Sequence, residues 1–142
     1  MRGRGIATLV CFALAGCASQ SGMGEGTSWN GSISEVGASG HSGTASAAPM
    51  DGGTHVNVSL SGGSSGGDHP WHVLEGVCES NGPIVGDPGA YPSLRPGASG
   101  DSSAEAQLNV SLDPEGSYYV NIHQSASQFD TIVGCGDLRP NQ

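Results

Sequence analysis

Short runs of alternating apolar and polar residues recur along the chain from residue 27 onward, separated by Gly, Ser, Asp and Pro. In the clearest run Val56, Val58 and Leu60 share one face, and His55, Asn57 and Ser59 share the other. A period of two residues is typical of β-strands with one buried face. The pattern predicts seven strands, at Ser28–Val36, Gly43–Ala48, Thr54–Ser61, Trp71–Glu75, Ala104–Leu112, Ser117–His123 and Thr131–Cys135.

These strands predict an all-β fold. Alternation places Leu108, Val110 and Leu112 on one face of their strand; the late strand has Tyr118, Val120 and Ile122 on one side and Tyr119, Asn121 and His123 on the other. No window has a sustained helical period, and frequent turn residues favour an antiparallel sandwich or barrel. Residues 79–103 hold four of the eight prolines and are predicted to form one long loop.

The N-terminus has the pattern of an export signal. Arg2 and Arg4 precede the apolar run Ile6–Ala15, which is too short to cross a bilayer as a helix. The run leads into Leu14-Ala15-Gly16-Cys17, which resembles the box at which bacterial lipoproteins are acylated and cleaved. The alternative is an ordinary signal peptide followed by a chance cysteine.

This reading predicts a signal peptide at 1–16, an acylated Cys17, a flexible tether at 17–26 and a β domain at 27–142. Ala18 follows the cysteine where an inner-membrane signal would have aspartate, which favours the outer membrane. The predicted location is therefore the cell envelope, with the domain facing the periplasm or the cell surface.

Composition narrows the function classes. The chain has 25 glycines, 5% aromatic residues, no lysine and a formal charge of −9. Without Arg2 and Arg4, two arginines remain against 13 acids, which gives the mature chain a charge of −11. Such a surface excludes nucleic acid as a partner, because binding to phosphates requires basic side chains. Attachment to the membrane through Cys17 is the predicted contact, and no protein partner is identified.

Cysteine usage predicts one cross-link. Cys11 is removed with the signal and Cys17 carries lipid, so Cys78 and Cys135 remain. An exported compartment is oxidising, which favours a disulfide between them. The alternative, a pair of thiolate metal ligands, lacks the usual Cys-x-x-Cys spacing.

Four segments in order resemble the copper/zinc superoxide dismutases. His69–Gly76 resembles the strand that carries copper ligands in that family, and Val120–His123 resembles the late strand that supplies another ligand. Cys78–Pro83 and Ile132–Gly136 resemble the two segments that hold the family's disulfide cysteines. The resemblance implies a Greek-key β-barrel or sandwich of about eight strands with one disulfide. It places His72 and His123 at two copper-ligand positions.

The departures from this family bear on activity. Leu74 and Ile84 stand where the family has two further histidines, no histidine lies between His72 and His123, and Ile132 stands where a guiding arginine is expected. A redox-active copper ion needs three or four fixed nitrogen donors. The sequence therefore predicts a catalytically degenerate domain that acts as a binding or structural module, with no assigned catalytic residue or cofactor and no zinc.

The alternative is an enzyme or copper handler whose mononuclear site uses His72, His123 and a third donor, from His69, His55 or Asp87. A weaker possibility is an interaction protein that binds a partner through loop 79–103.

The same residues also have purely structural interpretations. In these, His72 and His123 are packed polar residues, His69 is structural, and His41 and His55 are solvated. Glu75 is either an acceptor for His72 or a surface carboxylate, and Trp71 and Tyr118 are core residues, although Tyr91, Tyr118 and Tyr119 together could form a small binding face.

Overall fold

The structure is a computed structural model that describes residues 26–141. The predicted signal peptide, the acylation of Cys17 and all of the tether except residue 26 lie outside the described residues.

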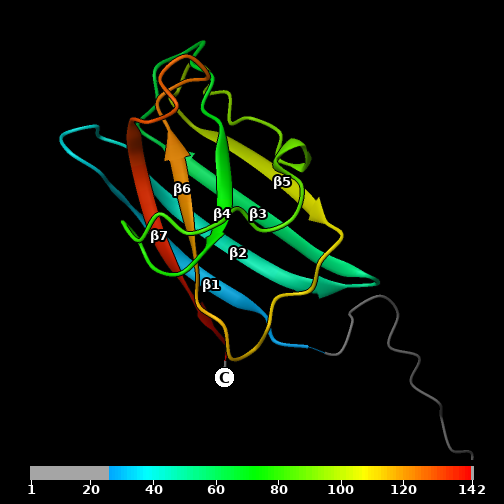
Figure 1. The fold of residues 1–142 in the computed structure, drawn as a ribbon. Helices are drawn as coiled ribbons and strands as arrows, with labels where there is room; N and C mark the ends of the chain where they lie inside the picture. The colour runs from blue at the N-terminus through cyan, green and yellow to red at the C-terminus, as the bar shows by residue number, and fades with distance from the viewer. Residues whose placement is uncertain (1–25, 142) are drawn as a thin grey trace, which may run out of the picture.

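All seven predicted strands form, and they make one antiparallel sheet (Figure 1). Their bounds are β1 Trp29–Glu35, β2 Ser42–Met50, β3 Gly53–Ser61, β4 Trp71–Glu75, β5 Ser102–Leu108, β6 Tyr118–His123 and β7 Ile132–Pro140. Their order in the sheet is β4-β6-β7-β1-β2-β3-β5, so β4 and β5 are the outer strands. The all-β, antiparallel part of the prediction is confirmed.

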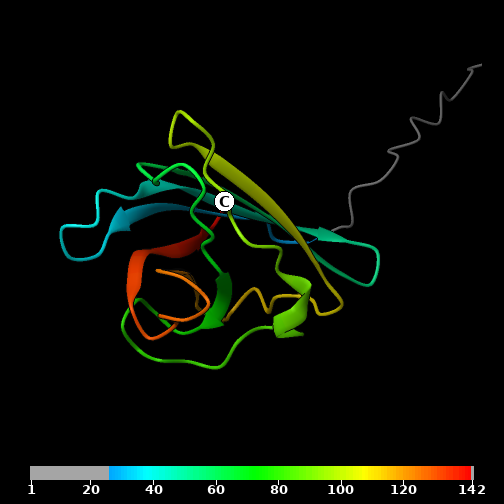
Figure 2. The ribbon, with the colours of Figure 1, turned by 90° about the horizontal axis from the view of Figure 1, so that it is seen from above.

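The sheet curls into a half-barrel around its core. Figure 2 shows β2, β3 and β5 on one side of the interior and β4 and β6 on the other, with β7 continuing the curve. Val56 and Val58 of β3 belong to the same buried cluster as Val120 and Ile122 of β6, although three strands separate β3 from β6 in the sheet. Burying these inward faces against each other is the main favourable term in folding.

Two strand ends differ from the prediction. β5 stops at Leu108 because its partner β3 begins at Gly53, which leaves no strand for later residues to pair with. Val110 is exposed, so its predicted place on the buried face with Leu108 is wrong. β7 runs five residues beyond the predicted end, because it pairs with β6 on one edge and with β1 on the other.

Residues 79–103 form structure that the prediction of one long loop did not include. Glu75 N donates to Pro83 O and Val85 N to Val73 O, so the start of this segment lies along β4. A 3-10 turn, η1 at Pro88–Ala90, follows, and Ser102 already belongs to β5. The outer edge of β4 is thereby hydrogen-bonded rather than free, which protects it from pairing with another chain.

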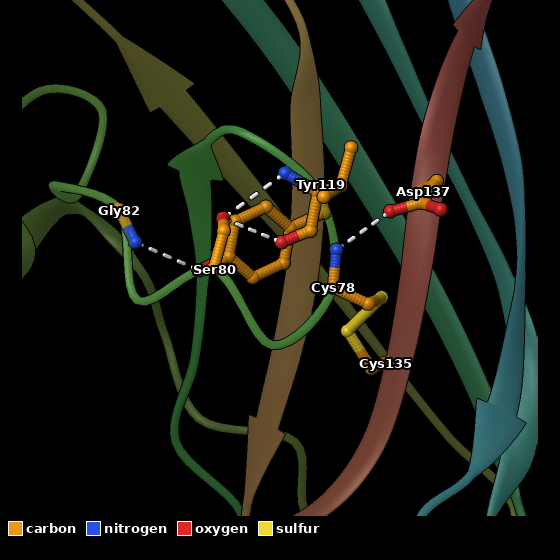
Figure 3. The surroundings of a disulfide bond; sticks show 7 residues. Cys78, Ser80, Gly82, Tyr119, Cys135 and Asp137 are labelled. Atoms are coloured by element: carbon orange, nitrogen blue, oxygen red, sulfur yellow. Dashed lines mark hydrogen bonds between the residues drawn. A yellow bond between two sulfur atoms is a disulfide. The ribbon is translucent and has the colours of Figure 1, made fainter.

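The disulfide Cys78–Cys135 is present, with its Cα atoms 6.0 Å apart. Cys78 N also donates to the Asp137 carboxylate at 2.8 Å, and Gly82 N donates to the Tyr119 hydroxyl at 3.1 Å (Figure 3). The segment from Cys78 to Gly82 is therefore attached to β7 and β6. Tyr119 is fully buried although it lies on the face of β6 opposite Val120.

Candidate functional site: a buried histidine pair

His72 and His123 meet at the junction of β4 and β6, in the positions that the sequence singled out. His72 Nδ1 lies 3.3 Å from His123 Nε2, and the two side chains are 6% and 5% exposed. His72 pairs with Asn121, and His123 lies two residues further along β6, so alternation places both histidine side chains on the same face of the sheet.

Backbone carbonyls orient the two rings. His123 Nδ1 lies 2.7 Å from the Phe129 carbonyl oxygen. A carbonyl only accepts, so His123 Nδ1 carries a proton and Nε2 holds a lone pair when the ring is neutral. His123 Nε2 therefore carries a lone pair, which accepts a hydrogen bond when His72 Nδ1, 3.3 Å away, carries a proton.

Both rings are neutral at neutral pH. The pKa of His72 is lowered to about 4, mainly by burial and then by the neighbouring His123, while the Pro88 backbone partly opposes the shift. Burial also lowers the pKa of His123, and the Phe129 carbonyl and the charge of Asp130 partly offset that effect. Neutral imidazole is the form that binds metal ions.

Aromatic rings enclose the pair. The Phe129 ring stacks on the His123 ring with centroids 3.8 Å apart and planes 14° apart. The Tyr91 ring meets His72 edge-to-face at 5.0 Å, and its hydroxyl donates to Val85 O. Tyr91, Tyr118 and Tyr119 are all buried, so the suggested tyrosine binding face is wrong, whereas Trp71 and Tyr118 are core residues as predicted.

A third metal ligand is missing from the described part of the chain. Among residues 26–141, no group of three or more His, Cys, Asp or Glu side chains is arranged to hold a metal ion. The suggested third donors are engaged elsewhere: His69 Nδ1 lies 3.1 Å from the His123 carbonyl oxygen, Asp87 accepts from Gly89 N at the start of η1, and His55 pairs with Glu105 on the outer face. Glu75 is exposed at the end of β4.

A second histidine contact lies beside the first, and sequence reasoning missed it. His41, predicted to be solvated, is only 8% exposed, and its ring meets the His69 ring at 4.9 Å. Neither ring nitrogen of His41 has a hydrogen-bond partner among the described residues. No local pattern signals this burial, because it arises when the turn between β1 and β2 packs against the segment that leads into β4.

The donor set does not fit the copper and zinc ions that the dismutase resemblance implies. A tetrahedral zinc site takes four ligands, and a copper ion that changes oxidation state needs three or four nitrogens. Two imidazoles meet neither requirement.

A broad concavity lies elsewhere, on the outside of β1, β2 and β7. It is lined mainly by polar side chains and by the disulfide, and no histidine lines it.

A comparison with models of protein families and with curated proteins found no match. Within residues 26–141, no helix has the length and apolar character that a membrane span requires. The functional interpretation therefore depends on the site itself and on the resemblance argued from the sequence.

Proposed function

We propose that this protein is a lipid-anchored envelope protein whose domain is a divergent relative of the copper/zinc superoxide dismutases and acts as a binding module without redox catalysis. The anchor is an acylated Cys17, and the domain lies in the periplasm or at the cell surface. The curled sheet, its disulfide and the meeting of His72 with His123 support the relationship, and we propose the Greek-key barrel connectivity on the same grounds.

The observation that carries the loss of catalysis is a pair of imidazoles beside which residues 26–141 arrange no third metal ligand. Leu74 and Ile84, which stand at the family's other ligand positions, are bridge partners beside β4 and are apolar. A copper ion held by two nitrogens lacks the ligands that stabilise its oxidised form. It would also dissociate readily, so it could not serve as a resident catalyst.

The charge of the chain opposes the same activity. Superoxide is an anion, and efficient capture needs a positive field that steers it to the metal. The mature chain carries a formal charge of −11, and Ile132 occupies the position where the family has an arginine. We infer that an anionic substrate is repelled rather than attracted.

A second candidate is a copper handler with a mononuclear site. The favouring observation is that His72 Nδ1 and His123 Nε2 lie 3.3 Å apart and that the Phe129 carbonyl oxygen accepts a hydrogen bond from His123 Nδ1. This candidate requires metal exchange but no redox cycle.

Copper loading and a superoxide assay test the proposal. Protein purified from membranes in detergent is loaded with Cu(II), dialysed, and analysed for metal content and superoxide consumption. We expect less than stoichiometric copper after dialysis and no acceleration over free buffer. Stoichiometric retention together with near-diffusional consumption, on the order of 10⁸ M⁻¹s⁻¹ or faster, would refute the binding-module proposal.

Substitution of Cys17 tests the lipid anchor separately. We expect the chain to fractionate with membranes and to incorporate a labelled fatty acid, and Cys17→Ser to lose both properties. A Cys11→Ser chain is the matched control, because Cys11 lies inside the predicted signal peptide and should not affect the label. Equal labelling of Cys17→Ser would remove the lipoprotein assignment.

A further inference from the structure

The outer edge of β5 carries backbone groups that point away from the sheet. β5, Ser102–Leu108, is the last strand of the sheet and pairs with β3 alone among the described strands (Figure 1). A side chain on Gly53 of β3 would collide with the carbonyl oxygen of Leu108, so this carbonyl points toward β3. In an antiparallel strand the two backbone groups of a residue point to one side, and successive residues alternate sides. The residues whose N–H and C=O groups point away from β3 are therefore Ser103, Glu105 and Gln107.

These outward groups have no backbone hydrogen-bond partner among residues 26–141. The other outer strand, β4, differs, because Pro83 and Val85 of the adjoining segment are hydrogen-bonded to its edge. β5 also lacks the features that usually protect an edge: it contains no proline and no lysine, and its register with β3 continues without a bulge. An open edge of this kind can accept an extended segment as a further strand.

Charge indicates which kind of segment fits this edge. Glu105 is the middle residue of β5, and its side chain is 67% exposed although the carboxylate lies 3.4 Å from His55. Arg95, which lines a hollow at the start of β5, lies 3.8 Å from the Asp68 carboxylate. A segment with Lys or Arg opposite Glu105 would form an oppositely charged cross-strand pair, which is favourable.

A second copy of this chain fits the same edge poorly. Two β5 strands that paired antiparallel about their centres would set two Glu105 carboxylates opposite each other, and like charges in this position destabilise a strand pair. The mature chain also carries a formal charge of −11, so two copies repel each other as whole molecules. The charges therefore favour a basic segment of another protein as the occupant.

The inner side of this edge is apolar. Ala104 of β5 is half-buried and packs at the margin of the core, and so does Ala90 of η1, which lies near β5. The side chains of an added strand also alternate, so every second one would lie beside Ala104 on the inner side and be removed from water. The segment that fits therefore alternates small apolar residues with polar or basic ones.

We propose that the outer edge of β5 binds an extended segment of a partner protein as an added antiparallel strand, with apolar residues alternating with polar ones and Lys or Arg opposite Glu105. The backbone groups of Ser103, Glu105 and Gln107 provide the hydrogen bonds, and the Glu105 carboxylate selects the basic segment. The inference rests on the proposed function, a binding module without redox catalysis, and it names the kind of partner that this module takes.

Binding of short peptides to the full chain tests the proposal. The probe is a capped Val-Thr-Val-Lys-Val-Thr-Val peptide, labelled through a Gly-Ser linker and titrated by fluorescence anisotropy against protein in detergent, with empty micelles as background. Two matched peptides have Glu in place of Lys, or an N-methyl group on the Lys amide, which keeps the charge and removes a backbone donor. We expect a Kd of about 100 µM or tighter for the probe and about tenfold weaker binding or less for both matched peptides.

Hydrogen exchange locates the bound peptide. The free N–H groups of Ser103, Glu105 and Gln107 should exchange rapidly in the unbound chain, because they have no backbone partner. At saturating probe, we expect their exchange, followed by NMR, to slow about tenfold or more. The N–H groups of Ala104 and Ala106, which face β3, should be slow with or without the peptide.

Variants of the chain connect the binding to the edge. Ser103→Pro removes an outward N–H, which an edge strand tolerates, and should weaken probe binding about tenfold, whereas Ser103→Thr keeps the N–H and should leave it unchanged. Glu105→Gln should narrow the preference for the Lys peptide over the Glu peptide about fivefold, and Glu79→Gln, beside the disulfide, should not. Circular dichroism and urea unfolding verify that each variant folds. If Ser103→Pro does not fold, the N-methylated peptide gives the same test on the unchanged chain.

Each contrary result has a definite meaning. No probe binding above the micelle background, binding that N-methylation leaves intact, or equal binding of the Lys and Glu peptides would each overturn the proposal. A chain that dimerises in sedimentation experiments and protects the Ser103, Glu105 and Gln107 amides without any peptide would overturn it as well, because the edge would then belong to a second copy. A chain that binds no probe and consumes no superoxide loses this inference alone, whereas rapid superoxide consumption refutes the proposed function.

Discussion

The side chain of His41 is buried in surroundings that do not satisfy its hydrogen-bonding groups. Both ring nitrogens lack a hydrogen-bond partner among residues 26–141, and the His69 ring lies edge-to-face against the His41 ring. An unsatisfied buried polar group costs about 1–3 kcal/mol. We expect His41→Leu, which keeps most of the volume, to raise the free energy of unfolding by about this amount in urea titrations at pH 7.5.

The matched control is His55→Leu, which removes a half-buried histidine and its 3.4 Å contact with the Glu105 carboxylate. Such pairs contribute little, so a change below about 1 kcal/mol is expected. Destabilisation by His41→Leu of more than about 1 kcal/mol would mean that the ring is satisfied by a bound water or another partner.

The same residue predicts a dependence of stability on pH. Burial lowers the pKa of His41, and the neighbouring His69 lowers it further, while the nearby backbone of Ser39 opposes the shift. Well above pH 6.5 the ring is neutral in both the folded and the unfolded chain, so it contributes no pH dependence there. Below pH 6.5 the unfolded chain takes up the proton first, and folding stability is lost as the pH falls.

We expect His41→Leu to flatten this loss between pH 6.5 and pH 5, measured as the urea midpoint at each pH. An identical pH profile for His41→Leu and the unchanged chain would assign the acid loss to other groups.

Among single residues, alternation predicted the shared inward face of Val56, Val58 and Leu60, which are buried. It could not predict the burial of His41 or Tyr119, because a segment distant in sequence covers each of them. Tyr119 lies on the outer side of β6 and is buried because the segment from Cys78 to Gly82 folds over it. Alternation specifies which face a side chain occupies, and only the tertiary fold determines whether that face is covered.

Among the elements, the segment between β4 and η1 depends most on its cross-link. The disulfide joins residues 57 positions apart, and the chain-entropy relation assigns such a loop about 4 kcal/mol. We expect Cys78→Ser with Cys135→Ser to lower the free energy of unfolding by about this amount in urea titrations. Loss of the disulfide should also increase hydrogen exchange at Gly82 N, which donates a hydrogen bond to the Tyr119 hydroxyl.

A control for that double variant is Asp137→Asn, which weakens the acceptor of Cys78 N but leaves the covalent link in place. It should cost about 1 kcal/mol and leave exchange at Gly82 N slow. If the double variant loses no more stability than Asp137→Asn, the hydrogen bonds and not the disulfide hold the segment.

Strand positions were predictable because a period of two residues is a local property of the sequence. Strand ends were not, because a strand continues only while it has a partner. β5 ends where β3 begins, and β7 extends because two neighbours pair with it. The turn η1 and the pairing of Pro83 and Val85 with β4 were missed for a similar reason, since their hydrogen bonds join distant segments.

For the whole molecule, the candidate site was predictable in part. The resemblance indicated His72 and His123, and the fold brings their rings together. The aromatic cover of Phe129 and the neighbouring contact of His41 with His69 had no signal in the sequence, because each depends on a loop conformation. Both the sequence and the structure offer too few nitrogen donors for a redox-active copper ion. Adding histidines tests whether this shortage limits copper binding.

Leu74 and Ile84 are the positions at which to add imidazoles. Leu74 lies two residues after His72 on the same strand, so the two side chains share a face, and Ile84 is its bridge partner. We expect Leu74→His with Ile84→His to tighten Cu(II) binding about tenfold or more for each added donor. Equilibrium dialysis measures this, with the single variants and the urea midpoint as controls for folding. Unchanged Cu(II) affinity in a folded double variant would mean that ligand number is not what limits the site.

Superoxide consumption by that copper-loaded double variant should still be slow, because the chain keeps its negative formal charge. Repulsion between like charges weakens as salt is added, since the Debye length falls from about 30 Å at 0.01 M to about 8 Å at 0.15 M. We therefore expect the rate constant to rise with ionic strength over this range, measured by pulse radiolysis. An attractive local field would give the opposite slope, because salt would then screen capture of the anion. A falling rate would show that a local cationic path near the site outweighs the overall charge, and that the missing arginine position is compensated elsewhere.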